Sequence, residues 1–178
     1  MAEQRFREKR TWIQGNLDYK ELYEKLILLH TKSRKEVKAY TAILLFQLKN
    51  GLKLLEAIRA FKSWLSAGYD EFQVPLAKRR KYFDTRIVFT PRILQKEAGE
   101  REKYVWVLDI SDKVLANRVK AFCKNHLKIN TTSLKYAFIE ELLKKIDAAS
   151  VRSILKYQDL KKLIDFEERI KGEGKNEG

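Results

Sequence analysis

Apolar residues near the start of the chain recur every three or four positions, which is the spacing of an amphipathic helix. Leu22, Leu26 and Leu29 follow this spacing. Asp18 precedes them, and its carboxylate can accept hydrogen bonds from the N–H groups of a first helical turn. The pattern therefore predicts a helix from Asp18 to about residue 30.

Two more amphipathic helices are predicted over about 35–48 and about 52–67. Asn50-Gly51 is expected to break the chain between them, and Gly68 is expected to end the second, because glycine readily leaves the helical conformation. The side chains expected in the core are Ala39, Ile43, Leu44 and Phe46 from the first helix and Leu54, Leu55, Ile58, Phe61, Trp64 and Leu65 from the second.

Three short segments follow, over about 71–76, 85–90 and 103–110, whose apolar and polar residues alternate in a strand-like way. This period of two predicts strands, and a small antiparallel sheet fits them. A helix beginning at Ser111 or Asp112 comes next. Its inward residues are expected to be Val114, Leu115, Val119 and Phe122, and its outward residues Arg118, Lys120 and Lys124.

Two further helices are predicted, one from about Thr131 to Ile146 and a short one ending at Tyr157. The predicted fold class is therefore mainly α with a small antiparallel β-sheet (α+β). At 178 residues with 44% hydrophobic residues, the chain has the size and apolar content of one domain, expected over 1–170. The glycine-rich, charged residues 171–178 are expected to be a disordered tail.

The charge of the chain gives a first indication of function, because its 38 basic residues outnumber the 24 acidic ones and give a net charge of +14. Such an excess favours a polyanionic partner, since basic clusters bind nucleic acid by releasing its counterions. A surface that serves solubility or heat stability is the alternative. The basic residues 1–14 could form a helix or an arm, or a disordered terminus. The 35% of charged residues, with one Cys and one Met, is typical of thermophile proteins.

Several function classes have no support in the sequence. No run of about 18 apolar residues and no apolar segment after the basic N-terminus is present, so a cytoplasmic protein without membrane contact is expected. The lone Cys123 excludes an intramolecular disulfide and is expected to pack in the core. His30 and His126 lack ligand-like neighbours, and no phosphate loop or Ser-His-Asp arrangement occurs, so neither a metal nor a cofactor is expected.

Three segments in order resemble one known family. Residues 50–56 read Asn-Gly-Leu-Lys-Leu-Leu-Glu, residues 72–91 contain two predicted strands around a basic run, and residues 131–166 place Asp159-Leu160 seven positions before Phe166. These segments resemble, respectively, the Thr-Gly-Leu-Arg-x-Ser-Glu helix, the lysine-bearing hairpin and the C-terminal tyrosine block of the tyrosine recombinases, the phage-integrase family. The resemblance covers about 35–168 and implies the fold of the recombinase catalytic domain.

In that family two arginines hold the scissile phosphate, a lysine protonates the leaving oxygen, a histidine and a His or Trp support the phosphate, and a tyrosine attacks it. The corresponding positions here are Lys53 and Lys135 for the arginines, Lys81 (or Lys78) for the lysine, Thr132 for the histidine, Tyr157 for the His/Trp and Phe166 for the nucleophile. Lysine neutralises a phosphate but lacks the bidentate fork of arginine, and a phenyl ring has no oxygen to attack phosphorus.

The resemblance therefore implies an inactive recombinase homologue that binds double-stranded DNA and acts as an accessory or regulatory protein on mobile DNA. Its partner could be an active recombinase or a second copy of itself. The expected DNA-binding residues are Lys53, Lys78, Arg79, Arg80, Lys81, Arg86, Lys135 and Tyr157.

Two other functions stay open at this point. Strand cleavage could use a displaced tyrosine, such as Tyr157 or Tyr136, although packing is the simpler role for both. The basic surface could instead serve RNA or an acidic protein. The basic run 78–81 could also be only a solvated turn.

Overall fold

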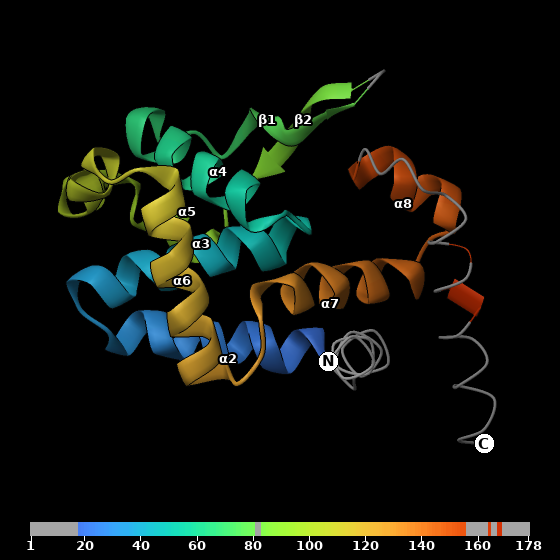
Figure 1. The fold of residues 1–178 in the computed structure, drawn as a ribbon, viewed down its shortest axis with the longest axis horizontal. Helices are drawn as coiled ribbons and strands as arrows, with labels where there is room; N and C mark the ends of the chain where they lie inside the picture. Colours follow the sequence, from blue (N-terminus) through green and yellow to red (C-terminus); the bar gives the residue numbers. More distant parts are fainter. Residues whose placement is uncertain (1–17, 81–82, 156–163, 165–166, 169–178) are drawn as a thin grey trace, which may run out of the picture.

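The computed structural model of the protein describes residues 18–80, 83–155, 164 and 167–168 (Figure 1). Several predicted features lie outside these residues: the arm 1–14, the tail 171–178, and the side chains of Lys81, Tyr157 and Phe166. In chain order the elements are α2 (Tyr19–Lys32), α3 (Lys35–Asn50), α4 (Leu54–Ala67), β1 (Glu71–Arg80), β2 (Phe83–Phe89), α5 (Arg92–Lys96), the 3-10 helix η1 (Ala98–Asp109), α6 (Asp112–Leu127), α7 (Thr131–Leu143) and α8 (Ala148–Leu155).

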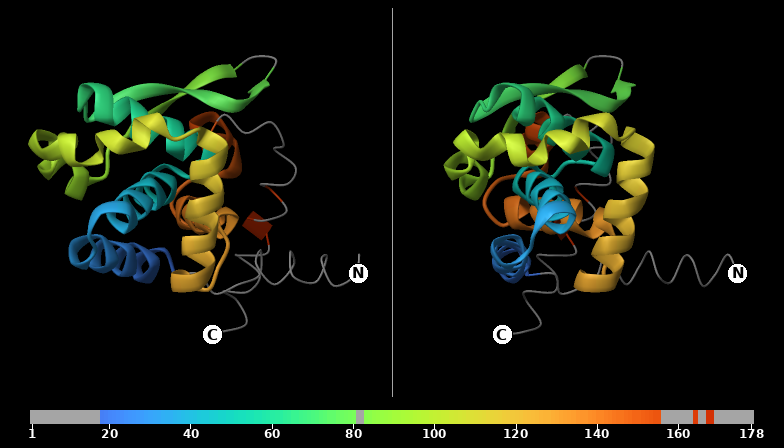
Figure 2. Two further views of the ribbon diagram at one scale, coloured as in Figure 1. Left: turned by 60° about the vertical axis from the view of Figure 1, so that its left-hand side comes forward. Right: turned by 90° about the vertical axis from the view of Figure 1, so that its left-hand side faces the viewer.

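The predicted fold class is confirmed, because the described chain is mainly helical and carries one two-stranded antiparallel sheet. Helix α3 lies at its centre, in contact with α2, α4, α6 and α7 (Figure 2). Every residue of α3 from Ala39 to Leu48 is buried, including polar Thr41 and Gln47. A helix buried on all sides needs neighbours on all sides, which fixes the relative positions of the surrounding helices.

An aromatic cluster joins α3, α4 and η1 in the main core. Phe61 stacks on Trp64 with ring centroids 5.9 Å apart, and Tyr104 meets Phe61 edge-on at 5.5 Å. Phe46 of α3 lies 6.4 Å from Phe61. These offset and edge-on geometries are the favourable arrangements of aromatic rings, so the cluster anchors η1 against α4.

Three predicted helix caps are confirmed, whereas the helix predicted to reach Ile146 ends at Leu143. The Asp18 carboxylate accepts hydrogen bonds from the N–H groups of Lys20 and Glu21, and Ser111 caps α6 by accepting from the N–H of Val114. Gly68 ends α4 in the left-handed conformation, with φ at +70°. These caps depend only on neighbouring residues, which is why a local pattern predicts them.

The strand predicted over 103–110 is wrong, because this segment belongs to η1. A 3-10 helix repeats every three residues, so Tyr104 and Val107 share one face and are buried. Val105 and Leu108 point outward and are 47% and 41% exposed. The buried residues therefore follow a period of three, which the unbroken apolar run 104–108 does not reveal.

Two residues predicted for the core are not buried. Val114 is 43% exposed, because Leu115, Val119 and Phe122 already define the inward face of α6 and Val114 lies about a quarter-turn from Leu115. Leu55 is only partly buried, whereas the other core residues predicted for α4 are buried.

Strands β1 and β2 form a hairpin that projects beyond the helices (Figure 1). Glu71 pairs with Phe89 and Pro75 with Thr85, and the register shifts between Pro75 and Arg80. Pro75 has no N–H to donate, and such a residue is tolerated in a sheet whose strands both lie at an edge.

The end of α7 and helix α8 share a small second core, separate from the main one. It consists of Ile139, Leu143, Ala148, Val151 and Leu155, with Tyr136, Phe138, Leu142 and Ile146 packed around it. Helix α8 lies below the hairpin in the views of Figures 1 and 2.

Candidate anion-binding site

A pocket of about 440 Å³ lies where α3, the start of α4, the middle of α6 and the first turns of α7 meet. The polar side chains lining it are Gln47, Lys53, Lys120, Thr131, Thr132, Lys135 and Tyr136. Three of these, Lys53, Thr132 and Lys135, are positions that the sequence pattern selected from segments far apart in the chain. The packing of α7 on α3 and of α6 on α4 brings them together.

Lys53 takes the N-cap position of α4. Its backbone N–H donates to Glu56 Oε1 at 3.0 Å, and Glu56 Oε2 accepts from the N–H of Ala77 on β1 at 3.0 Å. Glu56 is only 4% exposed, so this buried carboxylate fixes the start of α4 to the hairpin. Glu56 occupies the last position of the recombinase-like segment, and its role here is to position the backbone of Lys53.

The ammonium group of Lys53 cannot accept a hydrogen bond, so it cannot cap the first N–H groups of α4 as Ser or Asp would. The side chain of the N-cap residue makes no capping hydrogen bond in the structure. A positive charge at the positive end of a helix dipole is also electrostatically unfavourable. Both features favour a bound anion at the start of α4.

Helix α7 also begins at the pocket. Asn130 caps it, since Asn130 Oδ1 accepts from the N–H of Ser133 at 3.2 Å. Thr132 is exposed, and Lys135 follows three residues later on the same side of the helix. The pocket is therefore lined by the first residues of two helices, and helix N-termini attract anions through their unpaired N–H groups.

Gln47 contributes the buried polar group of the pocket. It is 1% exposed, and its amide oxygen has no hydrogen-bond partner among the described residues. An amide can rotate to present either its oxygen or its NH₂ group, so Gln47 could donate to a bound oxyanion. The sequence analysis did not select Gln47, although one polar residue between Ile43 and Leu48 interrupts an apolar run and is a usable signal.

Lys120 was expected only to face outward from α6, and the structure places it at the pocket with Lys53 and Lys135. No local signal could have joined these three, because their proximity depends on helix packing. Within the described part of the chain, no Asp or Glu lines the pocket. Its ammonium, hydroxyl and amide groups, together with two helix N-termini, suit a phosphate-like anion.

Arg86 was expected on the DNA-facing surface, and this expectation needs correction. The side chain is 4% exposed, and its guanidinium donates to the backbone carbonyls of Asn50 and Gly51. Burial lowers the pKa of Arg86 to about 10, although the charge of Glu56 raises it. Arg86 is a structural residue that holds β2 against the turn after α3.

The other predicted residues lie on or near the hairpin and the C-terminus. Lys78 is exposed on β1. Arg79 and Arg80 belong to β1 by their backbone, whereas their side chains, like Lys81, Tyr157 and Phe166, fall outside the described part of the structure.

A second polar cluster lies away from the pocket, around Glu97. His30 is fully buried and contacts Thr41 Oγ1 at 2.8 Å and Glu97 Oε1 at 3.1 Å, while the Tyr104 hydroxyl donates to Glu97 Oε2 at 2.7 Å. Burial by itself would raise the pKa of Glu97. The hydrogen bonds from His30 and Tyr104, with the charges of His30 and Lys103, lower it to about 2. The cluster joins α2, α3 and η1, so its role is structural.

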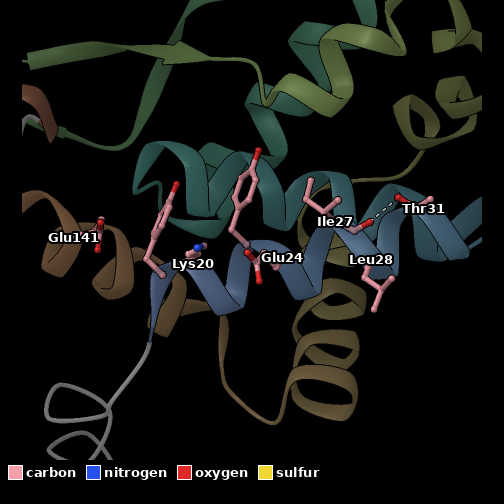
Figure 3. A pocket seen from close by; sticks show the side chains of 8 residues that line it. Lys20, Glu24, Ile27, Leu28, Thr31 and Glu141 are labelled. Carbon is pink, nitrogen blue, oxygen red and sulfur yellow. Dashed lines mark hydrogen bonds between the residues drawn. The ribbon is translucent and has the colours of Figure 1, made fainter.

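A larger groove of about 730 Å³ runs along α2 (Figure 3). Tyr19, Tyr23, Ile27 and Leu28 form its apolar wall, with Thr31 donating to the carbonyl of Ile27. The charged residues that also line it are Lys20, Glu24 and Glu141. Because charges of both signs do not suit a polyanion, the groove does not suit the ligand that the basic pocket suits.

Two other kinds of site were sought among the described residues. No group of three or more His, Cys, Asp and Glu side chains there could hold a metal ion. In the same part of the chain, no helix combines the length and the apolar character needed to cross a membrane.

The fold and the pocket define a mainly helical protein with a basic hollow between its central helices. The chain is similar to a protein of Acidianus two-tailed virus named "Putative integrase ORF241", with 37% identity over 149 residues. The matched region covers 83% of this chain and 56% of that protein, so the chain spans about half the length of this relative. The similarity supports the resemblance to integrases found in the motifs. No family model matches the chain, and no solved structure matches it.

Proposed function

We propose that the protein binds double-stranded DNA and holds a backbone phosphate in the pocket formed by Lys53, Lys120, Thr132 and Lys135. The observation that carries this proposal is the pocket itself, which brings together three lysines from three helices. The net charge of +14 supports a polyanionic partner. Similarity to a viral protein named an integrase supports DNA as that polyanion.

We further propose that the protein binds DNA without cleaving it by the recombinase reaction. Lys53 and Lys135 can neutralise a phosphate as point charges, but they lack the planar fork with which arginine holds a transition state. Phe166 supplies no nucleophilic oxygen. Such a protein would act as an accessory or regulatory factor on mobile DNA, by occupying a recombination site or by pairing with an active recombinase or a second copy of itself.

One observation favours a second function. The side chain of Tyr136 lines the same pocket as Lys53 and Lys135, so a phenol lies near the proposed phosphate position. A displaced tyrosine of this kind could attack the phosphate and form a covalent phosphotyrosyl bond. Strand cleavage through Tyr136 is therefore the competing proposal.

The binding proposal is tested by titrating a fluorescent DNA duplex with the protein at several salt concentrations. We expect affinity to fall steeply with salt, and Lys53→Ala and Lys135→Ala each to lower the log–log slope by about 0.9 per lost contact. Lys25→Ala, an exposed lysine on α2, is the matched control and should leave the slope unchanged. Equal thermal midpoints would exclude misfolding. No DNA binding by the wild type, or unchanged slopes in both pocket variants, would refute the proposal.

The cleavage proposal is tested on a nicked duplex resolved on a denaturing gel. Binding alone predicts no protein–DNA band after denaturation. A covalent band that disappears in Tyr136→Phe and persists in Tyr69→Phe would establish cleavage instead, because Tyr69 is 65% exposed and follows the C-cap of α4, away from the pocket lining. Preferential binding of RNA in the same titration would favour the RNA-interaction alternative.

A further inference from the structure

Helix α6 carries a row of three lysines and one asparagine along one side. Lys113, Asn117, Lys120 and Lys124 follow one another at intervals of four, three and four positions, which places them on one face of a helix. All four are exposed. We call these residues the α6 row.

The α6 row lies within the longest stretch of the chain that contains no Asp or Glu. Residues 113–139 contain no Asp or Glu, although the chain has 24 acidic residues in 178. The basic residues in this run are Lys113, Arg118, Lys120, Lys124, Lys128 and Lys135. The charge of this region is therefore not balanced by its own sequence.

The lysines of the row are not neutralised from other elements either. Among the described residues, Lys113, Lys120 and Lys124 form no salt bridge. Asp112, the nearest acidic residue in sequence, lies 2.6 Å from the ammonium group of Lys62 on α4. Its charge is thus paired with a residue outside the row.

The row is continuous with the pocket, because Lys120 belongs to both. From Lys113 to Lys124 the helix rises roughly 16 Å at 1.5 Å per residue. Along one strand of duplex DNA, phosphates follow one another every 3.4 Å of axis, so this length matches about five phosphates. The right-hand view of Figure 2 shows α6 along one edge of the described chain.

An exposed helix face that serves only solubility usually mixes the two signs of charge. Helix α2 does so, with Lys20 and Lys25 beside Glu21 and Glu24. The α6 row has only positive charges. This difference between two exposed helices of one protein favours a polyanion at α6.

We propose that the α6 row follows the sugar–phosphate backbone of the same duplex DNA whose phosphate occupies the pocket. The proposal rests on the proposed function, and extends it from one phosphate to a continuous contact. Lysine contacts to phosphates carry no base information, so this contact holds the duplex in position without selecting its sequence.

The test compares two double variants that remove the same charge. Lys113→Ala/Lys124→Ala removes the ends of the row and leaves Lys120 and the pocket intact. Lys25→Ala/Lys32→Ala removes two exposed lysines from α2, on another side of the molecule (Figure 2). We expect the row variant to lower the salt slope for duplex DNA by about two units and the α2 variant to lower it by less than half a unit.

The outcomes separate the two proposals. If the wild type does not bind duplex DNA, the proposed function fails. If the wild type binds and the two double variants have equal slopes, the proposed function stands and the α6 row is refuted. The variant Lys113→Arg/Lys124→Arg keeps both charges and should keep the wild-type slope. A row variant that loses affinity for duplex RNA but not for duplex DNA would overturn DNA as the partner of the row.

Discussion

Hydrogen bonds made by Arg86 and Asn50 join the hairpin to the end of α3. The guanidinium of Arg86 donates to the backbone carbonyl of Asn50, and the Asn50 side chain in turn bonds both the N–H and the carbonyl of Phe89 at 2.8 and 2.9 Å. These bonds fix the turn that leads into Lys53. The hairpin therefore contributes to the pocket indirectly, by positioning the end of α3.

Replacing Arg86 by lysine should destabilise the protein without weakening its DNA contacts. A lysine has no planar fork to reach the carbonyls of both Asn50 and Gly51, and a lost charge-assisted hydrogen bond to a buried group costs about 1.5–3 kcal/mol. Urea unfolding would measure the loss. The salt slope of DNA binding, measured well below the unfolding transition, should stay at the wild-type value. A lower slope at full stability would show that Arg86 contacts DNA after all.

Gly51→Ala should also destabilise the protein. Gly51 has φ at +63°, and a Cβ atom there would lie 2.3 Å from Cδ1 of Phe138. The left-handed conformation alone costs a non-glycine residue about 1–2 kcal/mol, and the contact with α7 adds to this. Gly99→Ala is the control, because no atom lies within 4 Å of its added Cβ. Equal thermal midpoints for the two variants would contradict this account.

Glu97 should make stability depend on pH in the acid range. Its folded pKa, about 2, lies below the ordinary value of 4.5, because hydrogen bonds from His30 and Tyr104 outweigh the opposing effect of burial. Its contribution is therefore complete above about pH 4.5 and is lost as the pH falls towards 2. The difference in unfolding free energy between wild type and Glu97→Gln should shrink over this window. Glu24→Gln, which alters an exposed carboxylate on α2, should show no comparable change. A difference that stays constant with pH would refute the role of Glu97.

Cys123 should be unreactive in the folded protein. The residue is fully buried, and burial raises the pKa of its thiol to about 12, so almost no thiolate forms near neutral pH. A thiol reagent should label the folded protein far more slowly than the denatured protein. When the denatured protein has reacted completely, less than about a tenth of the folded protein should have reacted. Rapid reaction of the folded protein would show that α6 opens readily.

Sequence predicts those parts of this fold that depend on near neighbours. Asp18, Ser111 and Gly68 cap their helices as expected, because a cap involves residues within one turn. The segment around Tyr104 was misassigned because its burial follows from packing on Phe61 and Trp64, which no local pattern reveals.

Among the residues of the candidate site, too, sequence predicts some and only the fold reveals the others. The family-like spacing selects Lys53, Thr132 and Lys135, which meet in one pocket. Gln47 and Lys120 join them only through helix packing. Arg86 is charged like its neighbours in the basic hairpin, and only the fold shows that its partners are backbone carbonyls.

Because Ile139, Leu143, Val151 and Leu155 form a core separate from the main one, we expect the protein to open in two cooperative units of unequal size. Because α8 packs chiefly on α7, its amide groups should exchange with solvent through a local opening that leaves the main core closed. Helix α7 belongs to both units, since Leu134 and Ala137 lie in the main core and Ile139 lies in the smaller one. We therefore expect its first turns, which carry Thr132 and Lys135, to keep their structure when α8 opens.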